Sequence, residues 1–129
     1  MRNMSFALTT AQMQARTKTV TRRMGWERLK SGELVRPVYK AMGLKRGESP
    51  QPICDPVRVI LVRREPLHAL LDDLDYGFAE VAKEGFANHP QYQWPSAFVE
   101  FFCATHRGCT PQTLVSRIEF EFVVPAAFA

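Results

Sequence analysis

The chain has 129 residues, of which 46% are hydrophobic and 23% are charged. This length and composition suit one domain, residues 1–129, with one core of moderate size. No apolar stretch reaches the length of a membrane span, and the first residues lack the apolar region of a secretory signal, so a membrane partner is excluded and a cytoplasmic location is expected. The three cysteines argue against a disulfide framework, because their number is odd.

The charge is divided unevenly along the chain. Residues 1–48 carry 11 Lys and Arg against 3 Asp and Glu, a net +8, whereas residues 49–129 carry 6 against 10, a net −4. Positive charge confined to the first third predicts a basic face that attracts polyanions. A solvated face with no partner gives the same pattern, so the charge alone does not define a function.

Strand-type and helix-type patterns follow one another in blocks. In chain order, we expect a strand at 4–8, a helix at 11–15, an extended segment at 16–23, one helical turn at 26–29, a strand at 34–39, a loop at 40–51, a strand at 57–62, helices at 67–74, 78–84 and 95–106, and a strand at 115–124.

Local signals set the ends of several of these elements. A threonine, Thr9 or Thr10, can cap the first helix, and Pro37 restricts its strand to an edge or a bulge. Gly85 is expected to end the helix at 78–84. The helix at 95–106 places three phenylalanines on its inner face as core: Phe98, Phe101 and Phe102.

The order of elements predicts the fold class. Strands dominate the start and the end, helices dominate the middle, and no βαβ repeat is present. We expect an α+β, mostly β protein: a small, mostly antiparallel β-barrel with flanking helices and a loose tail at residues 125–129. A cleft is expected where the helices meet the barrel mouth.

The segment from Arg16 to Arg23 is the most informative in the chain, because it places four cations and three hydroxyls around a single valine. It alternates Lys18, Val20 and Arg22 with hydroxyl residues, which indicates an extended backbone. Such a dense set of donors is suited to a phosphate, a carboxylate or the edge of a base.

The same segment resembles the signature of the ASCH domain, a family of the PUA-like superfamily. The hexad Lys18-Thr19-Val20-Thr21-Arg22-Arg23 matches the basic Lys-Thr-x-Thr-x-Arg stretch of that family without a gap, Gly32-Glu33 matches a following turn, and Val81 to Phe86 matches a later helix with an acidic residue. The order of elements agrees from about residue 4 to residue 122, and the sequence is most similar to uncharacterised, often phage-associated members.

The resemblance implies a PUA-like barrel and a role in binding RNA or a modified nucleoside. Some members remove the acetyl group from acetylcytidine, and by matching position the catalytic set would be Lys18 as base, Thr21 as nucleophile and Glu84 as acid or base. Another has been described as a ribonuclease, a reading that here rests on analogy alone. This chain is longer than the compact amidohydrolase type, and its extra segments at 43–54 and 95–106 could reshape or cover the cleft.

Residues that could bind the ligand surround this set. They are Arg16, Thr19, Arg22, Arg23, Trp26, Tyr39 and Lys40, with Tyr92 and Trp94 as further stacking candidates for RNA, including single strands, or a nucleoside. A structural alternative stays open: Glu84 could pair with Lys18 or Arg23 simply to fasten a helix to the barrel.

The segment from 103 to 109 has two explanations, a metal site and ordinary packing. Cys103, His106 and Cys109 are spaced as three possible zinc ligands, but the paired Cys-x-x-Cys of common zinc modules is missing. Packing of a buried cysteine and a helix-terminal histidine explains the pattern as well. The sequence also lacks a P-loop, a dinucleotide fingerprint and a Ser-His-Asp set, and we expect no cofactor and no metal.

Overall fold

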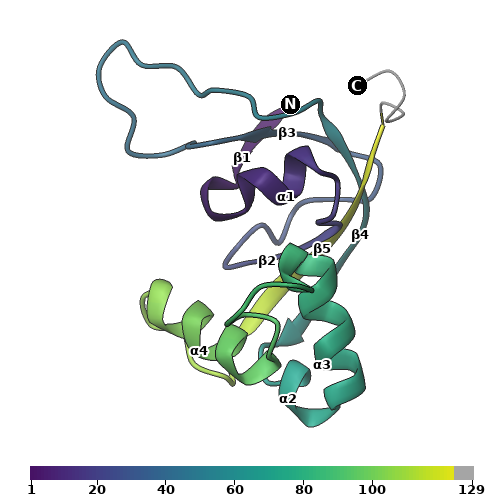
Figure 1. Ribbon diagram of the computed structural model, residues 1–129. Helices are drawn as coiled ribbons and strands as arrows, with labels where there is room; N and C mark the ends of the chain where they lie inside the picture. Colours follow the sequence, from purple (N-terminus) through teal and green to yellow (C-terminus); the bar gives the residue numbers. More distant parts are fainter. Residues whose placement is uncertain (124–129) are drawn as a thin grey trace.

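Five strands form one mixed sheet in the computed structural model, which describes residues 1–123 (Figure 1). In spatial order they are β1 (Arg2–Ser5), β3 (Leu34–Val38), β4 (Val57–Pro66), β5 (Leu114–Phe122) and β2 (Val20–Arg23). The pair β1 and β3 is parallel, and the other three pairs are antiparallel. The expected α+β class and the mostly antiparallel pairing are therefore confirmed, whereas the tail at 125–129 lies outside the described residues.

The sheet is not closed within residues 1–123, so the expected closed barrel is not found. The strands β1 and β2 are its two edges, and no backbone ladder joins them. A side chain spans this seam instead: the Arg23 guanidinium on β2 donates to the backbone oxygen of Ser5, at the end of β1, over 2.6 Å. One side-chain bond cannot replace a ladder, and the seam leaves room between the two edges.

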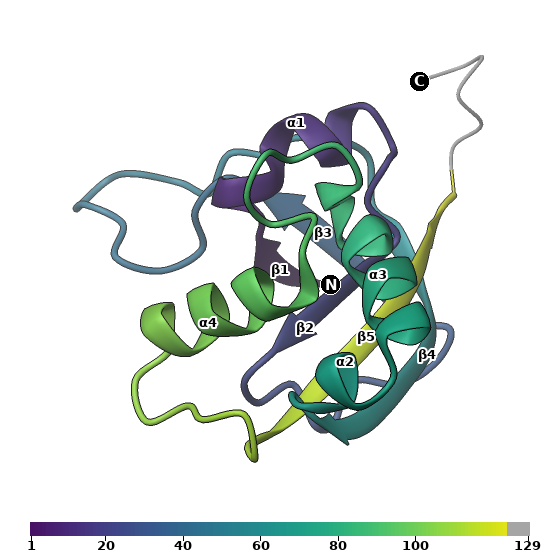
Figure 2. The ribbon, with the colours of Figure 1, turned by 60° about the horizontal axis from the view of Figure 1, so that its bottom comes forward.

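Short helices connect the strands. They are the 3₁₀ turn η1 (Ala7–Thr9), α1 (Thr10–Gln14), α2 (Ala69–Asp72), α3 (Leu74–Val81), the π-helical turn η2 (Ala82–Phe86) and α4 (Pro95–Thr105). Figure 2 shows α4 beside β1 and β2, whereas α2 and α3 lie on the side of the sheet formed by β4 and β5. Pro95 occupies the first turn of α4, where its missing N–H costs no hydrogen bond.

Two apolar clusters form the core, and β5 contributes to both. Ile118 and Phe120 pack in a cluster with Phe6 and Met13, while Val115 packs with the helices α2 to α4. In the sequence, Val115 and Arg117 alternate with Ser116 and Ile118, and with Ile118 facing inward this pattern predicts that 115 and 117 face outward. They are buried because the helices cover that face as well.

Two local expectations are wrong, each for a physical reason. Residues 26–29 form a turn and not a helical turn, since Trp26 has a left-handed φ of 56°. Pro37 lies on an inner strand, where it is tolerated because β4 pairs with β3 only at Leu34 and Val35. The expected helix end at Gly85 is confirmed, because its φ of 100° breaks the helical geometry within η2.

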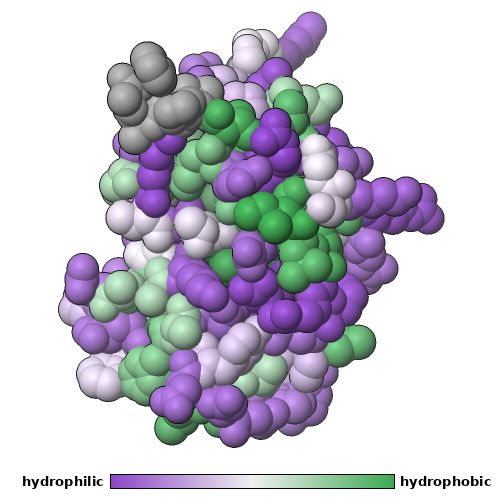
Figure 3. Space-filling model, turned by 90° about the vertical axis from the view of Figure 1, so that its right-hand side faces the viewer, coloured by the Kyte–Doolittle hydropathy of each residue, from purple (hydrophilic) through white to green (hydrophobic). Residues whose placement is uncertain are grey.

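The surface carries a long loop and scattered apolar side chains. The loop between β3 and β4 projects from the body of the molecule in Figure 1. Figure 3 shows one face of the molecule, on which apolar groups gather among hydrophilic ones. Within the described residues no helix has both the length and the apolar character needed to cross a bilayer.

Candidate functional site

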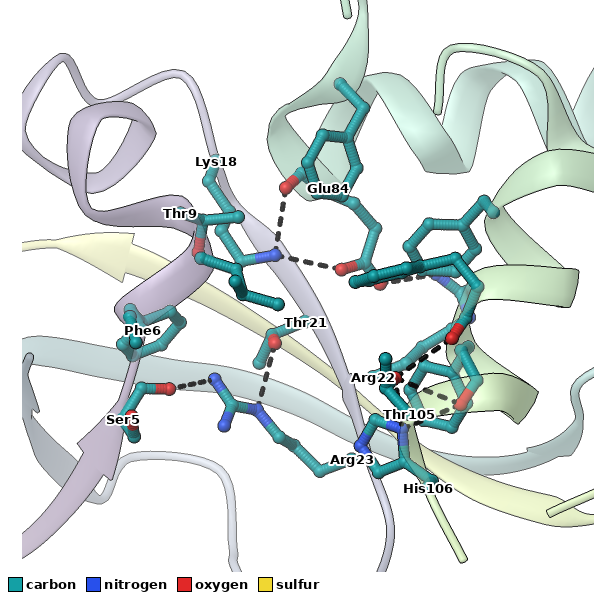
Figure 4. A pocket seen from close by; sticks show the side chains of 16 residues that line it. Ser5, Phe6, Thr9, Lys18, Thr21, Arg22, Arg23, Glu84, Thr105 and His106 are labelled. Carbon is teal, nitrogen blue, oxygen red and sulfur yellow. Dashed lines mark hydrogen bonds and ion pairs between the residues drawn. The ribbon is translucent and has the colours of Figure 1, made fainter. Parts of the chain in front are cut away.

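The backbone around Thr19 aims Lys18 at η2. The Thr19 N–H donates to the Lys83 oxygen over 2.8 Å, and its carbonyl accepts from Phe120 N–H over 3.0 Å. The Lys18 ammonium then donates to the Glu84 carboxylate (Oε1, 2.9 Å) and to the Glu84 backbone oxygen (2.8 Å), as Figure 4 shows. Both side chains are buried, with 3% of each residue exposed. The fold therefore brings the predicted lysine and glutamate into direct contact, although 66 positions separate them in the sequence.

Arg22 extends this pair into a buried network. Its guanidinium donates to Glu84 Oε2 over 3.1 Å, to Glu80 Oε1 over 2.7 Å and to Glu65 Oε1 over 3.4 Å. Arg117 on β5 donates to both oxygens of Glu80, the second bond being 3.0 Å long. Three buried cations thus face three buried carboxylates, an arrangement that avoids an uncompensated buried charge.

Burial and pairing shift the pKa values in this network. Burial lowers the pKa of Lys18 below its usual value of 10.5, and Arg23 and Arg22 add to this, whereas the contact with Glu84 opposes it. Burial alone would raise the pKa of Glu80, but the hydrogen bonds from Arg117 and Arg22 outweigh it and bring that pKa to about 2. Lys18 is therefore the cation in the network whose proton is most easily released, since the carboxylates raise the pKa of both Arg22 and Arg117.

Arg23 lies on the other side of β2 and meets different partners. Its Nε donates to the Thr21 hydroxyl oxygen over 3.1 Å, and its carbon Cζ lies 4.7 Å from the centre of the Phe6 ring. Burial lowers the pKa of Arg23 to about 10, so it remains protonated at neutral pH. No ion pair to Arg23 occurs among residues 1–123. It is a partly buried cation with donors left for a ligand.

A cavity of about 350 Å³ opens at the seam between β1 and β2 (Figure 4). Its polar wall includes Lys18, Thr21, Arg23 and Glu84, and its other wall is aromatic. The aromatic wall consists of Phe6, Phe86 and four residues of α4 and its end, Phe98, Phe101, Phe102 and His106. A donor-rich wall opposite an aromatic wall suits a flat, polar, heteroaromatic ligand.

The end of α4 shapes the cavity through His106. The His106 ring stacks on Phe102, with a centroid distance of 3.9 Å and an angle of 12°. Its Nδ1 lies 2.8 Å from the Phe102 backbone oxygen, a contact that needs a proton on Nδ1. In the neutral ring Nε2 is then left as a hydrogen-bond acceptor.

The structure gathers part of the predicted site and disperses the rest. Lys18, Thr21, Arg22, Arg23 and Glu84 line the one cavity. Among residues 1–123, Thr19 contributes backbone hydrogen bonds only. The other predicted binding residues lie elsewhere: Arg16 beside Phe122 in a second pocket, Trp26 under Arg2, and Tyr39 and Lys40 at the base of the long loop.

The further stacking candidates are already engaged. Tyr92 stacks on His89 at 4.5 Å, and Trp94 packs edge-on against Phe78 at 5.8 Å. Neither lines the cavity. Two aromatic residues that do line it, Phe101 and His106, were expected to serve as core and as a possible metal ligand.

Sequence reasoning missed the carboxylates and the arginine behind the cavity. Glu80, Glu65 and Arg117 come from α3, β4 and β5 and carry no recognisable motif. A signal was nevertheless present for Glu80, because it lies one helical turn before Glu84 and shares its face. Arg117 has no such signal, because a charged residue that alternates with apolar ones along a strand is typical of a solvent-facing position.

No group of three or more His, Cys, Asp or Glu within residues 1–123 is arranged to hold a metal ion. His106 turns toward Phe102 and the cavity, whereas the thiols of Cys103 and Cys109 contact each other. The three possible zinc ligands Cys103, His106 and Cys109 therefore do not point toward one common position.

The fold and site define an α+β protein with a buried ion network behind a mixed polar and aromatic cavity. No family model matches the chain, and no curated protein matches it. Among solved structures, the crystal structure of protein EF3133 from Enterococcus faecalis V583, of the family DUF984, is similar with a TM-score of 0.46 and 15% identity, over 95% of this chain and 78% of that chain. These findings do not show the family of the chain, and the ASCH resemblance stays a prediction.

Proposed function

We propose that the protein is an ASCH-type, PUA-like domain that binds one modified pyrimidine nucleoside, free or turned out of an RNA strand, in the cavity between β1 and β2. The observation that carries this proposal is the pairing of a protonated, carboxylate-free Arg23 with an aromatic wall in a space of about 350 Å³. Arg23 supplies fixed donors for a base carbonyl, and the wall supplies stacking.

The size of the cavity favours a single nucleoside over a strand. Pockets for small molecules begin at about 300 Å³, and a groove for several nucleotides is longer and open at both ends. An unstacked base is bound by stacking on aromatic side chains and by hydrogen bonds to its edge. The cavity has both elements, with Phe101 and His106 on one side and Thr21 on the other.

The ion network makes the ligand's base, more than its phosphate, the group that is recognised. Lys18 and Arg22 already face Glu84, Glu80 and Glu65, so they add little free positive charge to the cavity. Only Arg23 remains as a cation without a carboxylate partner among the cavity residues. The basic first third of the sequence is thus partly neutralised by carboxylates from the second half.

Titration calorimetry with acetylcytidine, cytidine and uridine tests this proposal. Arg23→Gln should weaken binding of the preferred nucleoside at least 10-fold, because a partly buried charged donor is lost. Arg46→Gln removes the same charge from the exposed loop and should leave the affinity unchanged. Absence of binding to any nucleoside and to single-stranded RNA containing it, or equal losses in both variants, would overturn the proposal.

A second candidate, an amidohydrolase acting on the acyl group of an acylated cytidine, is favoured by a specific arrangement. The Thr21 hydroxyl oxygen accepts a hydrogen bond from Arg23, which leaves its own proton to donate to a base. Neutral Lys18, which burial favours by lowering the lysine pKa, would take that proton as Thr21 attacks the acyl carbon. Glu84, which is hydrogen-bonded to Lys18, would relay the proton to the leaving amine as the amide bond breaks. A water molecule would then hydrolyse the Thr21 ester, which releases the acid and restores the threonine hydroxyl. Arg23 would stabilise the oxyanion that forms on the acyl carbon.

Loss of the ultraviolet signature of acetylcytidine measures this reaction. Thr21→Val should abolish turnover while the protein still binds the nucleoside, because the substitution keeps the shape and removes the nucleophile. Lys18→Ala should also abolish turnover, and Lys83→Ala, which removes a half-exposed lysine near Glu80, should not. Turnover that survives Thr21→Val would reject this mechanism and leave the binding proposal intact.

A further inference from the structure

Two thiols meet at the end of the helix that walls the cavity. Cys103 lies in the last turns of α4, and Cys109 lies in the segment that follows. Their sulfur atoms are 3.9 Å apart, with the Cys103 thiol donating to the Cys109 sulfur. Both are free and only partly buried, so a small oxidant can reach them. The third cysteine, Cys54, lines a different pocket beside Asp55 and Arg16.

The turn between the thiols is already formed. The Cys109 N–H donates to the His106 backbone oxygen over 3.1 Å, and Gly108 supports the turn with a φ of 77°. A disulfide requires a sulfur separation of about 2.05 Å, so the two atoms must approach by about 2 Å. Rotation of two side chains, one of them outside any helix, can supply a movement of this size.

We propose that Cys103 and Cys109 are a redox-active pair that forms a reversible intramolecular disulfide and thereby fixes the wall of the cavity. The oxidant is a small disulfide such as oxidised glutathione. The Cys109 thiolate attacks it and releases one glutathione, and the Cys103 thiolate then attacks the Cys109 sulfur and releases the second. Two electrons pass from the protein thiols to the oxidant. The two protons that the protein thiols lose are taken up by the two glutathione thiolates, so that two glutathione thiols are formed.

The order of attack follows from the surroundings of the two groups. Burial and the hydrogen bond to Cys109 raise the pKa of the Cys103 thiol, which disfavours it as the first nucleophile. Once Cys109 carries a glutathione, the two protein sulfurs are neighbours, and closure is intramolecular. Cys54 has no such neighbour, because both other cysteines belong to the second half of the chain and to a different cluster.

The bond would act on the cavity through Thr105 and His106. Both line the cavity, and both lie between the two cysteines in sequence. A bond from 103 to 109 would tie the end of α4 to the turn that carries His106 against Phe102. Oxidation is therefore expected to slow amide exchange in residues 104–109. The formation of the bond does not depend on which ligand the cavity binds.

Mass spectrometry of the full chain in glutathione buffers of graded ratio tests the proposal. Cys54→Ala protein should lose the mass of two hydrogens and both titratable thiols, give a peptide linked from 103 to 109, and recover both thiols with dithiothreitol. Cys103→Ser and Cys109→Ser proteins, which remove one partner each, should instead stop at a glutathione adduct.

Amide exchange supplies the second readout. Residues 104–109 should exchange at least several-fold more slowly in the oxidised protein, and β3, none of whose residues lines the cavity, should be unchanged. A linked peptide that forms only in denaturant, adducts on both cysteines without closure, or exchange that is the same in both states would overturn the proposal.

Discussion

At the scale of single residues, Arg22 shows why the first third of the chain is so basic. Its guanidinium contacts three carboxylates, yet within residues 1–123 its Nε is a buried nitrogen without a hydrogen-bond partner. Lys18 and Arg117 complete a set of cations that Glu65, Glu80 and Glu84 balance. Such networks cost desolvation, and removal of one member leaves a buried charge uncompensated.

The first prediction concerns Glu84, which accepts from both Lys18 and Arg22. Glu84→Gln should lower the free energy of unfolding by about 3 kcal/mol or more, since two buried cations lose their carboxylate. Urea denaturation measures the change. Glu121→Gln breaks a half-exposed pair with Arg58 and should have little effect. A loss of less than about 1 kcal/mol in Glu84→Gln would contradict this account.

The second prediction is the pH dependence set by Glu80. Its pKa is about 2 in the folded protein and 4.5 when unperturbed, so its stabilisation is present above 4.5 and is lost as the pH falls through 2. The shift corresponds to about 3 kcal/mol. Between pH 5 and pH 2, wild type should therefore lose about 3 kcal/mol more than Glu80→Gln. The free energy of unfolding of both proteins is measured by denaturation at graded pH. An equal loss in wild type and Glu80→Gln would show that the folded protein does not lower the pKa of Glu80.

At the scale of elements, η2 is the piece that brings Glu84 to Lys18. Gly85 inside it has a φ of 100°, and a Cβ there would lie 2.9 Å from Gln12 Cγ and 3.3 Å from Lys18 Cβ. The turn therefore needs glycine for its conformation and for the close approach of α1 and the chain before β2. The segment 81–86 could be located because it resembles a helix of the ASCH family. The π-helical form of this turn has no signal in the sequence.

The third prediction compares two glycines of positive φ. Gly108→Ala meets no atom within 4 Å, so it should cost only the conformational strain of about 1 kcal/mol. Gly85→Ala meets the same strain and also displaces Lys18 and Gln12, which should add about 1 to 3 kcal/mol. Thermal denaturation of both variants gives the difference. Equal losses would mean that the contact at Gly85 is not tight.

The helix α4 shows how far the sequence carried the prediction. Its start at Pro95 and the burial of Phe98 and Phe102 could be read from the sequence, and the structure confirms them, whereas Phe101 lines the cavity and is not part of the core. Its role could not, because a face that packs on a core and a face that walls a cavity have the same apolar pattern. Likewise, Lys18, Thr21, Arg23 and Glu84 could be grouped from a family resemblance, whereas Arg117 is defined only by long-range packing.

At the scale of the whole molecule, the open seam between β1 and β2 is where the site lies. A ladder there would fill the space that the cavity occupies, and Arg23 spans it with one bond to Ser5. The basic first third supplies the cations of this seam, and the acidic second part supplies the carboxylates that neutralise most of them. The expected closed barrel followed from the order of elements and from the family resemblance, and neither of these distinguishes a seam closed by a ladder from one bridged by a side chain.

The fourth prediction follows from this neutralisation. Binding of a nucleoside in the cavity should change less than about twofold between 50 and 300 mM salt, because it releases few counterions. Binding of a polyanion to the exposed loop cations would fall steeply over the same range. Calorimetry at graded salt separates the two. A steep loss for the uncharged nucleoside would contradict a base-directed site.

A structure of the protein with bound acetylcytidine, determined by crystallography, tests the central claim most directly. We predict that the base lies in the cavity between the aromatic wall of α4 and Thr21, with a base or acyl oxygen within hydrogen-bond distance of Arg23. A nucleoside bound at Tyr39 and Lys40 on the long loop, with the cavity unchanged, would contradict the account.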